Sequence, residues 1–163
     1  MVLAVSAGVL TAFKVLHILS AVYFGVGVVL ATIFTLQVPN TPTLPAKAKV
    51  MARSGRAALT ILVPGALLAG IFGFVLAFME FSHPFAQKWI LFSTILFVIS
   101  FVLGAASGPL NARTRRLVEA EARSPKPSRA AYQAADSLRP IILAGINLAI
   151  AVALVYLMFA QPN

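Results

Sequence analysis

Five ionisable side chains lie in or beside the apolar stretches of the chain, and they are the residues best able to do chemistry. They are both histidines of the sequence, two lysines and one of its four acids: Lys14, His17, Glu80, His83 and Lys88. Neutral imidazole binds iron or copper and carries protons near neutral pH. Ionisable groups inside a membrane are expensive, usually face other helices and usually have a partner. We therefore predict a functional site where these side chains meet.

Haem is the cofactor that suits this small set of ligands best. Apolar walls and small residues leave room for the macrocycle, while axial side chains project from facing helices. With two histidines in the sequence, bis-histidine ligation requires the pair His17 and His83. Otherwise His17 binds the iron, with Lys14, Lys88, a methionine or an open position opposite. Copper or zinc would find fewer ligands, and the lack of cysteine excludes thiolate centres.

The spacing of these residues also predicts their contacts. Lys14 and His17 are three residues apart, so they share one helical face and both can approach Glu80 on a facing helix. In this hypothesis Glu80 and Lys88 tune the site electrostatically. Structural interpretations stay open: Lys14 snorkels to the membrane surface, His17 hydrogen-bonds inside the bundle, and His83 is solvated in its loop. No catalytic residue follows from the sequence, and whether the chain is an enzyme stays open.

The composition places these residues in a membrane protein. Of 163 residues, 60% are hydrophobic and 10% are charged, and the mean hydropathy is +0.94. A soluble domain has about 25% charged residues. Four apolar runs are long enough to cross a bilayer: residues 10–36, 57–79, 89–110 and 141–160. Lipid offers no partners to an exposed backbone, and the runs lack the alternation of barrel strands, so they should be helices.

The charges between the runs predict the orientation. Nearly all basic residues of this +9 chain lie in the two connectors, 37–56 and 111–139. Basic residues in this position, beside apolar runs, are typical of a topology signal and of contact with anionic lipids, and less so of nucleic-acid binding. Both connectors then face the cytoplasm as loops, and both termini lie on the outer side. We predict an all-α four-helix bundle in the bacterial inner membrane, with residues 1–163 as a single transmembrane domain.

Small residues at helical spacing predict the packed face of each span. The stripes are Ala21, Gly25, Val28 and Thr32 in the first span; Ala66, Gly70, Gly73 and Ala77 in the second; Ser100, Gly104 and Gly108 in the third; and Gly145, Ala149 and Ala153 in the fourth. We also expect Asn147 to hydrogen-bond within the bundle. Residues 112–122 should continue the third helix past the membrane and stop at Ser124-Pro125, because proline disfavours helix before it.

The start of the first run resembles known membrane families. The stretch Phe13-Lys14-Val15-Leu16-His17-Ile18-Leu19-Ser20-Ala21 is similar to the opening of an uncharacterised family of bacterial four-span integral membrane proteins. Its Lys-x-x-His spacing also resembles HemJ-type protoporphyrinogen oxidases and, more distantly, the copper-resistance D membrane domain. Pro64 and Gly73, followed by Lys88-Trp89, match the general layout. The resemblance implies a haem b site at His17 to which Lys14 contributes.

A haem-associated membrane protein with a redox role is the leading hypothesis. A non-catalytic small subunit is the alternative; it would pack in a homo-oligomer or a larger membrane complex through its glycine faces. A transporter or proton relay is the third class, for which four spans are few.

Overall fold

A computed structural model describes residues 6–161, and across this range every regular element is a helix. Helix α1 (Ala7–Gln37) is followed by a long rod made of α2 (Leu44–Ala57), the π-helical turn η1 (Ala58–Leu62) and α3 (Val63–Glu80). The short turn η2 (Pro84–Ala86) leads into α4 (Lys88–Glu121), and α5 (Arg129–Ala135) leads into α6 (Arg139–Ala160). Four of the helices are long and apolar enough to span a membrane, which confirms the predicted fold class.

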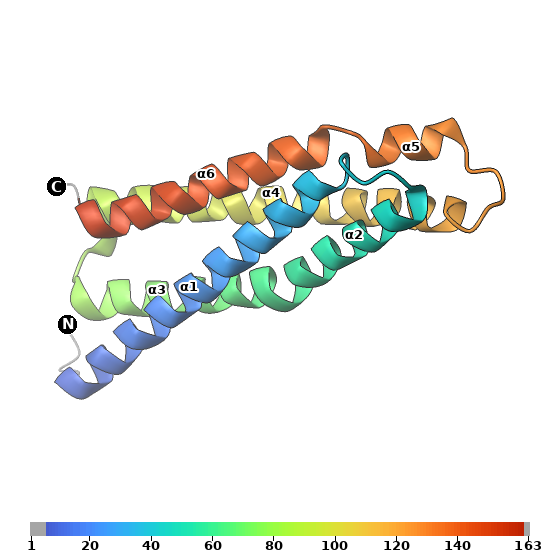
Figure 1. Cartoon of the computed structure of the whole chain (residues 1–163). Helices are drawn as coiled ribbons and strands as arrows, with labels where there is room; N and C mark the ends of the chain where they lie inside the picture. The colour runs from blue at the N-terminus through green and yellow to red at the C-terminus, as the bar shows by residue number, and fades with distance from the viewer. Residues whose placement is uncertain (1–5, 162–163) are drawn as a thin grey trace.

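The spanning helices run side by side along the long axis of the molecule (Figure 1). Helix α1 begins and α6 ends at the same end, where η2 joins α3 to α4; we call this the η2 end. The connections from α1 to α2 and from α4 through α5 to α6 lie at the opposite end. Helix α1 packs on both α3 and α6, and α6 packs on α4, whereas α3 and α4 hardly touch.

The closest approach of two helices is the crossing of α1 with the start of α3. A Cβ on Gly27 would lie 2.6 Å from the Cα of Leu62, and one on Gly65 would lie 2.7 Å from the backbone nitrogen of Phe24. Each glycine therefore lets the backbone of the other helix come closer than any side chain would permit. Gly25, which the sequence placed on this face, has nothing within 4 Å of its Cβ position.

Other members of the predicted stripes do face the bundle. Val28, Thr32, Ala66 and Ser100 are buried. Ser100 donates a hydrogen bond to Oδ1 of Asn147 at 3.0 Å, which confirms the expected role of that asparagine. This bond joins α4 to α6 inside the membrane, where few alternative partners exist for either side chain.

The stripe predicted for the fourth span is wrong. Gly145 and Ala149 are exposed, and α6 instead buries Ile150 and Leu154. Gly108 on α4 likewise meets nothing within 4 Å. Helix α6 packs through branched side chains and the Asn147 bond, so it does not need the close backbone approach that small residues permit.

Beyond the spans, α2, the last turns of α4, and α5 pack together into what we call the cap. Its core consists of Val38, Leu44, Ala48, Val118, Ala131 and Ala135. The end of α4 at Glu121 confirms the predicted extension of the third helix. The connector 37–56, expected to be a loop, is largely helix α2. Pro45 stands in its first turn, where a missing N–H does no harm.

The turn η1 interrupts the rod just before Pro64. Proline has no N–H and so cannot bond the carbonyl of Thr60, four residues earlier. The hydroxyl of Tyr23 donates to that carbonyl at 2.9 Å. Because lipid offers no hydrogen bonds, Tyr23 supplies from α1 the partner that the helix lacks.

Candidate functional site at the η2 end

The η2 end brings together two of the residues singled out in the sequence. Lys14 lies two turns into α1, and Glu80 is the last residue of α3. Their side chains form a salt bridge. Lys14 is 48% exposed and Glu80 is 31% exposed, so the pair remains accessible from outside the bundle. The expected contact of Lys14 with Glu80 is therefore confirmed, whereas His17 does not share it.

His17 lies one turn further along α1, and its ring packs on α3. Its Nδ1 is 3.1 Å from the carbonyl oxygen of Ala69. A carbonyl can only accept, so Nδ1 carries the proton, and Nε2 of the neutral ring keeps its lone pair. A Cβ on Gly73 would lie 2.9 Å from Cε1 of the ring. Gly73 thus provides the space that the imidazole occupies.

The structure does not bring His83 and Lys88 into this contact. His83 is exposed just before η2, and Lys88 is exposed at the start of α4. The ring of His17 is level with Gly73, which lies two helical turns, or about 10 Å, before Glu80 along α3. His83 lies beyond Glu80 in the chain, so the two imidazoles sit at different levels. Within residues 6–161, His17 therefore has no second histidine beside it.

A metal at His17 would need ligands that the protein does not supply. Within residues 6–161 no three His, Asp or Glu side chains lie close enough together to hold a metal ion. Zinc and copper sites in proteins usually take three or four protein ligands. Haem iron brings four nitrogen ligands in its macrocycle and needs only axial side chains from the protein. Among these metal centres, a haem needs the fewest ligands from the protein.

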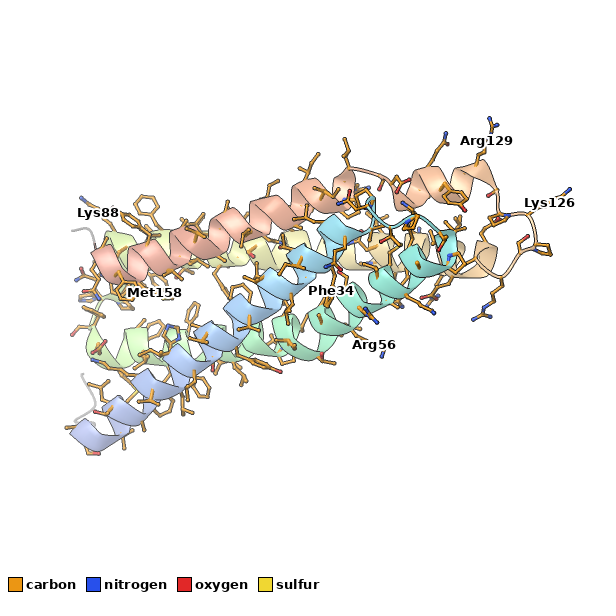
Figure 2. All side chains as sticks on the ribbon, in the orientation of Figure 1. Phe34, Arg56, Lys88, Lys126, Arg129 and Met158 are labelled. Carbon is orange, nitrogen blue, oxygen red and sulfur yellow. The ribbon has the colours of Figure 1, made fainter. Side chains whose placement is uncertain are left out.

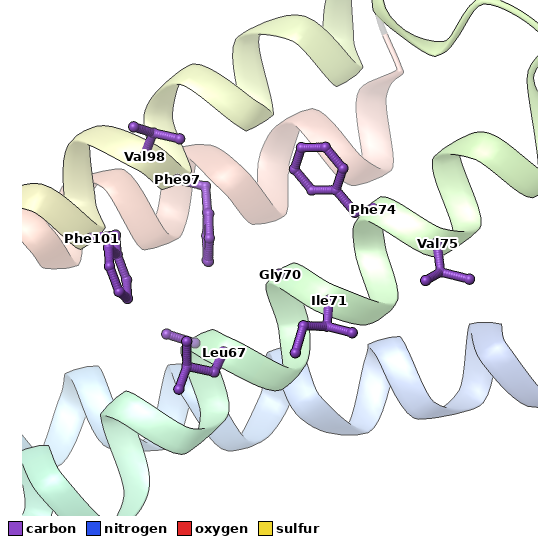
Figure 3. A pocket seen from close by; sticks show the side chains of 9 residues that line it. Leu67, Gly70, Ile71, Phe74, Val75, Phe97, Val98 and Phe101 are labelled. Carbon is purple, nitrogen blue, oxygen red and sulfur yellow. The ribbon is translucent and has the colours of Figure 1, made fainter.

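A groove that the sequence did not predict lies between α3 and α4 (Figure 3). Its volume is about 470 Å³, and its lining is wholly apolar: Ala66, Leu67, Gly70, Ile71, Phe74, Val75, Phe97, Val98 and Phe101. A Cβ on Gly70 would lie 3.0 Å from the ring of Phe97, so this ring reaches across to α3. Gly70 faces α4 while Gly73 faces His17, and the groove is thus separate from the histidine.

Three phenylalanines link the groove to the connecting segment. The ring of Phe74 lies 6.2 Å from the rings of both Phe78 and Phe85, and the last two are 6.0 Å apart, measured between centroids. Phe85 belongs to η2, so this cluster fixes η2 against the end of α3. The signal that could have found it is the spacing of the phenylalanines on α3, which places them on one helical face.

The most buried charged side chain lies in the cap and was missed in the sequence. Lys47 donates through Nζ to the carbonyls of Val38, at 3.1 Å, and Pro39, at 3.4 Å, and it pairs with Asp136. These partners use all three protons of the ammonium. Val38 caps the end of α1, so the lysine also stabilises the negative end of that helix dipole. No local pattern in the sequence indicates this role of Lys47, because its carboxylate partner lies in the other connector.

Comparison with known proteins gives a family for the chain. A family model described as "Predicted integral membrane protein (DUF2269)" matches residues 11–162. No curated protein and no solved structure matches the chain. The likeness to HemJ-type proteins and the copper-resistance D domain therefore stays a prediction from the Lys-x-x-His motif. The match extends over almost the whole chain and includes all four membrane-length helices, and the chain thus belongs to this family of predicted integral membrane proteins.

Proposed function

We propose that this chain binds haem b at the η2 end and serves a redox role, with Nε2 of His17 as an axial ligand. The supporting observation is the hydrogen bond from Nδ1 of His17 to the carbonyl of Ala69. Histidines that bind metals nearly always donate their other ring N–H to a carbonyl, a carboxylate or water. Such a bond fixes the tautomer, orients the ring and raises its basicity. His17 thus has the hydrogen bond that a ligand histidine needs.

The neighbouring residues give the site a suitable electrostatic setting. Lys14 lies one turn from His17 and offers a cation to the acidic groups of a ligand, while Glu80 balances that charge. Gly73 holds no side chain against the ring, so the imidazole keeps its place beside α3. When bound, haem supplies one-electron chemistry. The protein contributes the ligand, its orientation and the local charge.

We also propose that the η2 end and both termini lie outside, that the cap lies in the cytoplasm, and that the chain forms one transmembrane domain in the bacterial inner membrane. In support, 11 of the 13 lysines and arginines, all except Lys14 and Lys88, lie in the cap or where the spans enter it. Arg56, Arg113 and Arg139 are exposed beside the ends of three spans. At this level they can bind the headgroups of anionic lipids.

The absorbance spectrum of the purified protein tests the haem proposal. We expect a Soret band and a reduced-minus-oxidised difference spectrum in the wild type, and their loss in His17→Ala. His83→Ala is the matched control, because His83 is exposed and distant from the Ala69 contact; it should keep both signals.

A wild type without a Soret band, or a band unchanged in His17→Ala, would contradict the proposal. Stoichiometric partner proteins that co-purify from native membranes without any cofactor would support the non-catalytic subunit instead. Equal transport by wild-type and His17→Ala proteoliposomes would exclude the histidine from a proton-relay or transport role.

A further inference from the structure

The cap ends in three exposed basic residues, Arg123, Lys126 and Arg129, which we call the tip. They lie in and next to the segment that joins α4 to α5. Lys126 and Arg129 project away from the rest of the molecule, at the end farthest from Lys88 (Figure 2). The tip is therefore accessible to molecules in solution.

Two of the three acids of the cap are paired with basic side chains outside the tip, and the third, Glu121, is one negative charge beside three positive ones. Asp136 pairs with the buried Lys47. Glu119 forms an ion pair with Arg115 one turn before it on α4, at 3.4 Å. Glu121 accepts a hydrogen bond from a backbone N–H. Each of the three acids in this part of the sequence thus has an internal partner.

The segment that carries the tip is also held in one shape. The Glu121 carboxylate accepts from the backbone N–H of Ser128 at 2.8 Å, which closes the loop between the two helices. The hydroxyl of Ser128 accepts from the N–H of Ala131 and so caps α5. Pro125 and Pro127 restrict the backbone between them. A preorganised loop loses less conformational entropy when it binds a partner.

The tip lies too far from the bilayer to serve the lipid headgroups. Helix α4 continues from Leu110, the last apolar residue of its span, to Glu121. At 1.5 Å per residue this extension is about 16 Å long. The cap continues the long axis of the bundle and does not fold back along its side (Figure 1). Screening at physiological salt acts over about 8 Å, so the membrane's surface potential is weak at the tip.

We infer that the tip is a docking site for an acidic segment of a partner protein. Arginine binds carboxylates through two parallel hydrogen bonds, which suits Arg123 and Arg129 to aspartate and glutamate side chains. Tyr132 is exposed three residues after Arg129, on the same face of α5, and adds the kind of aromatic contact common in protein interfaces. Three cations are few for nucleic acid, whose binding strength grows with the number of phosphates neutralised.

The test uses the full-length protein in nanodiscs of uncharged phosphatidylcholine and a fluorescent peptide of consecutive glutamates as the probe. The tip variant carries Arg123→Gln, Lys126→Gln and Arg129→Gln. Its matched control loses the same charge near the membrane, through Arg56→Gln, Arg113→Gln and Arg139→Gln. We expect the tip variant to bind the peptide about tenfold more weakly, since it loses three exposed ion pairs of modest strength, and the control to change much less.

Equal losses in the two variants would overturn the inference, because net charge alone would then explain binding. The inference is also overturned if an oligonucleotide or a phosphatidylglycerol vesicle displaces the peptide more effectively than free polyglutamate does. The three competitors are compared at equal concentrations of negative charge. Circular dichroism should show unchanged helix content in both variants, since all six side chains are exposed. Haem binding plays no part in this measurement, so its outcome is independent of the function proposed above.

Discussion

Two lysine–carboxylate pairs hold the opposite ends of this molecule, in very different surroundings. In the cap, the side chain of Lys47 is 4% exposed and has two backbone carbonyls as partners besides Asp136. At the η2 end, Lys14 and Glu80 are both partly exposed and bond to each other. A buried ammonium has lost its water and needs a protein partner for each proton, whereas an exposed one keeps its hydration.

The difference separates a structural pair from an exchangeable one. Lys47 joins the end of α1 to the segment between α5 and α6, and its partner Val38 belongs to the core of the cap. Lys14 can exchange Glu80 for water or for a ligand at little cost, because exposed pairs contribute little stability. The accessible pair lies one turn from His17, so the chemistry we propose lies at the end that can change partners.

Removing the buried cation should have the largest effect. Lys47→Met leaves the carbonyls of Val38 and Pro39 without a partner and deprives Asp136 of its counter-ion. We expect a loss of about 2 kcal/mol in the free energy of unfolding, chiefly from the buried carbonyl of Val38, because the Asp136 side chain is 44% exposed and can be solvated. Unfolding in mixed micelles, followed by circular dichroism, measures it. Lys49 is an exposed lysine on the same helix, and the free energy of unfolding of Lys49→Met should stay within about 0.5 kcal/mol of the wild type. Similar losses in the two variants would show that burial does not distinguish these lysines.

Exchanging the two charges within each pair sharpens the comparison. The double variant Lys47→Asp, Asp136→Lys would turn a carboxylate toward two backbone carbonyls and should remain about 2 kcal/mol less stable than wild type. The double variant Lys14→Glu, Glu80→Lys keeps an accessible ion pair and should fall within about 0.5 kcal/mol of wild type. Restoration of full stability by both exchanges would show that the carbonyls around Lys47 are unimportant.

A methyl group on Gly73 should disturb the histidine. The added Cβ would lie 2.9 Å from Cε1 of His17, so the ring must shift and weaken its bond to Ala69. We expect Gly73→Ala to lose about 1 kcal/mol of stability and, if haem is bound, to displace the Soret maximum. Gly25→Ala has open space around it and is the matched control. A displaced spectrum in the control, or none in Gly73→Ala, would contradict this role of the glycine.

The smallest change in stability should come from Lys14→Gln, at about 0.5 kcal/mol, because the pair it breaks is exposed. The main effect we expect from Lys14→Gln is on the redox potential. Losing the cation and freeing the Glu80 charge both disfavour an added electron nearby, so the midpoint potential of a haem at His17 should become more negative. A potentiometric titration measures this shift. An unchanged midpoint potential would show that Lys14 and Glu80 do not act electrostatically on a haem at His17.

The spans were predictable from sequence because long apolar runs in lipid have almost no alternative to helix. The extension of α4 was also predictable, since proline at Pro125 marks where that helix must end. Helix α5 was not, as its seven residues are too few to show a period. The packed face of α6 was misread because small residues occur on several of its faces, and composition cannot say which one meets a neighbour.

The part of the site that was predictable is the part set by the spacing of residues along a single helix. The spacing of Lys14 and His17 placed them on one face, and the stripe through Gly73 led to Glu80 as the partner of Lys14. His17 was expected to approach Glu80 too, but it bonds to Ala69. The sequence could not show the bond from His17 to Ala69, since every residue offers a backbone carbonyl. The ion pair of Lys47 with Asp136 was not predictable either, because nothing in the local sequence distinguishes this lysine from the exposed basic residues around it.

The π-helical turn η1 determines how the residues of α3 are rotated about the helix axis relative to those of α2. The carbonyl of Ala58 accepts from the N–H of Val63, five residues on, so the rod contains one residue more than regular α-helical winding requires. Each residue of an α-helix advances by about 100°. A π turn winds by less than this per residue, so η1 shifts the faces of α3 that carry Gly65, Gly73 and Glu80 relative to α2. This short segment thus ties the rotation of the cap to the assembly of the η2 end.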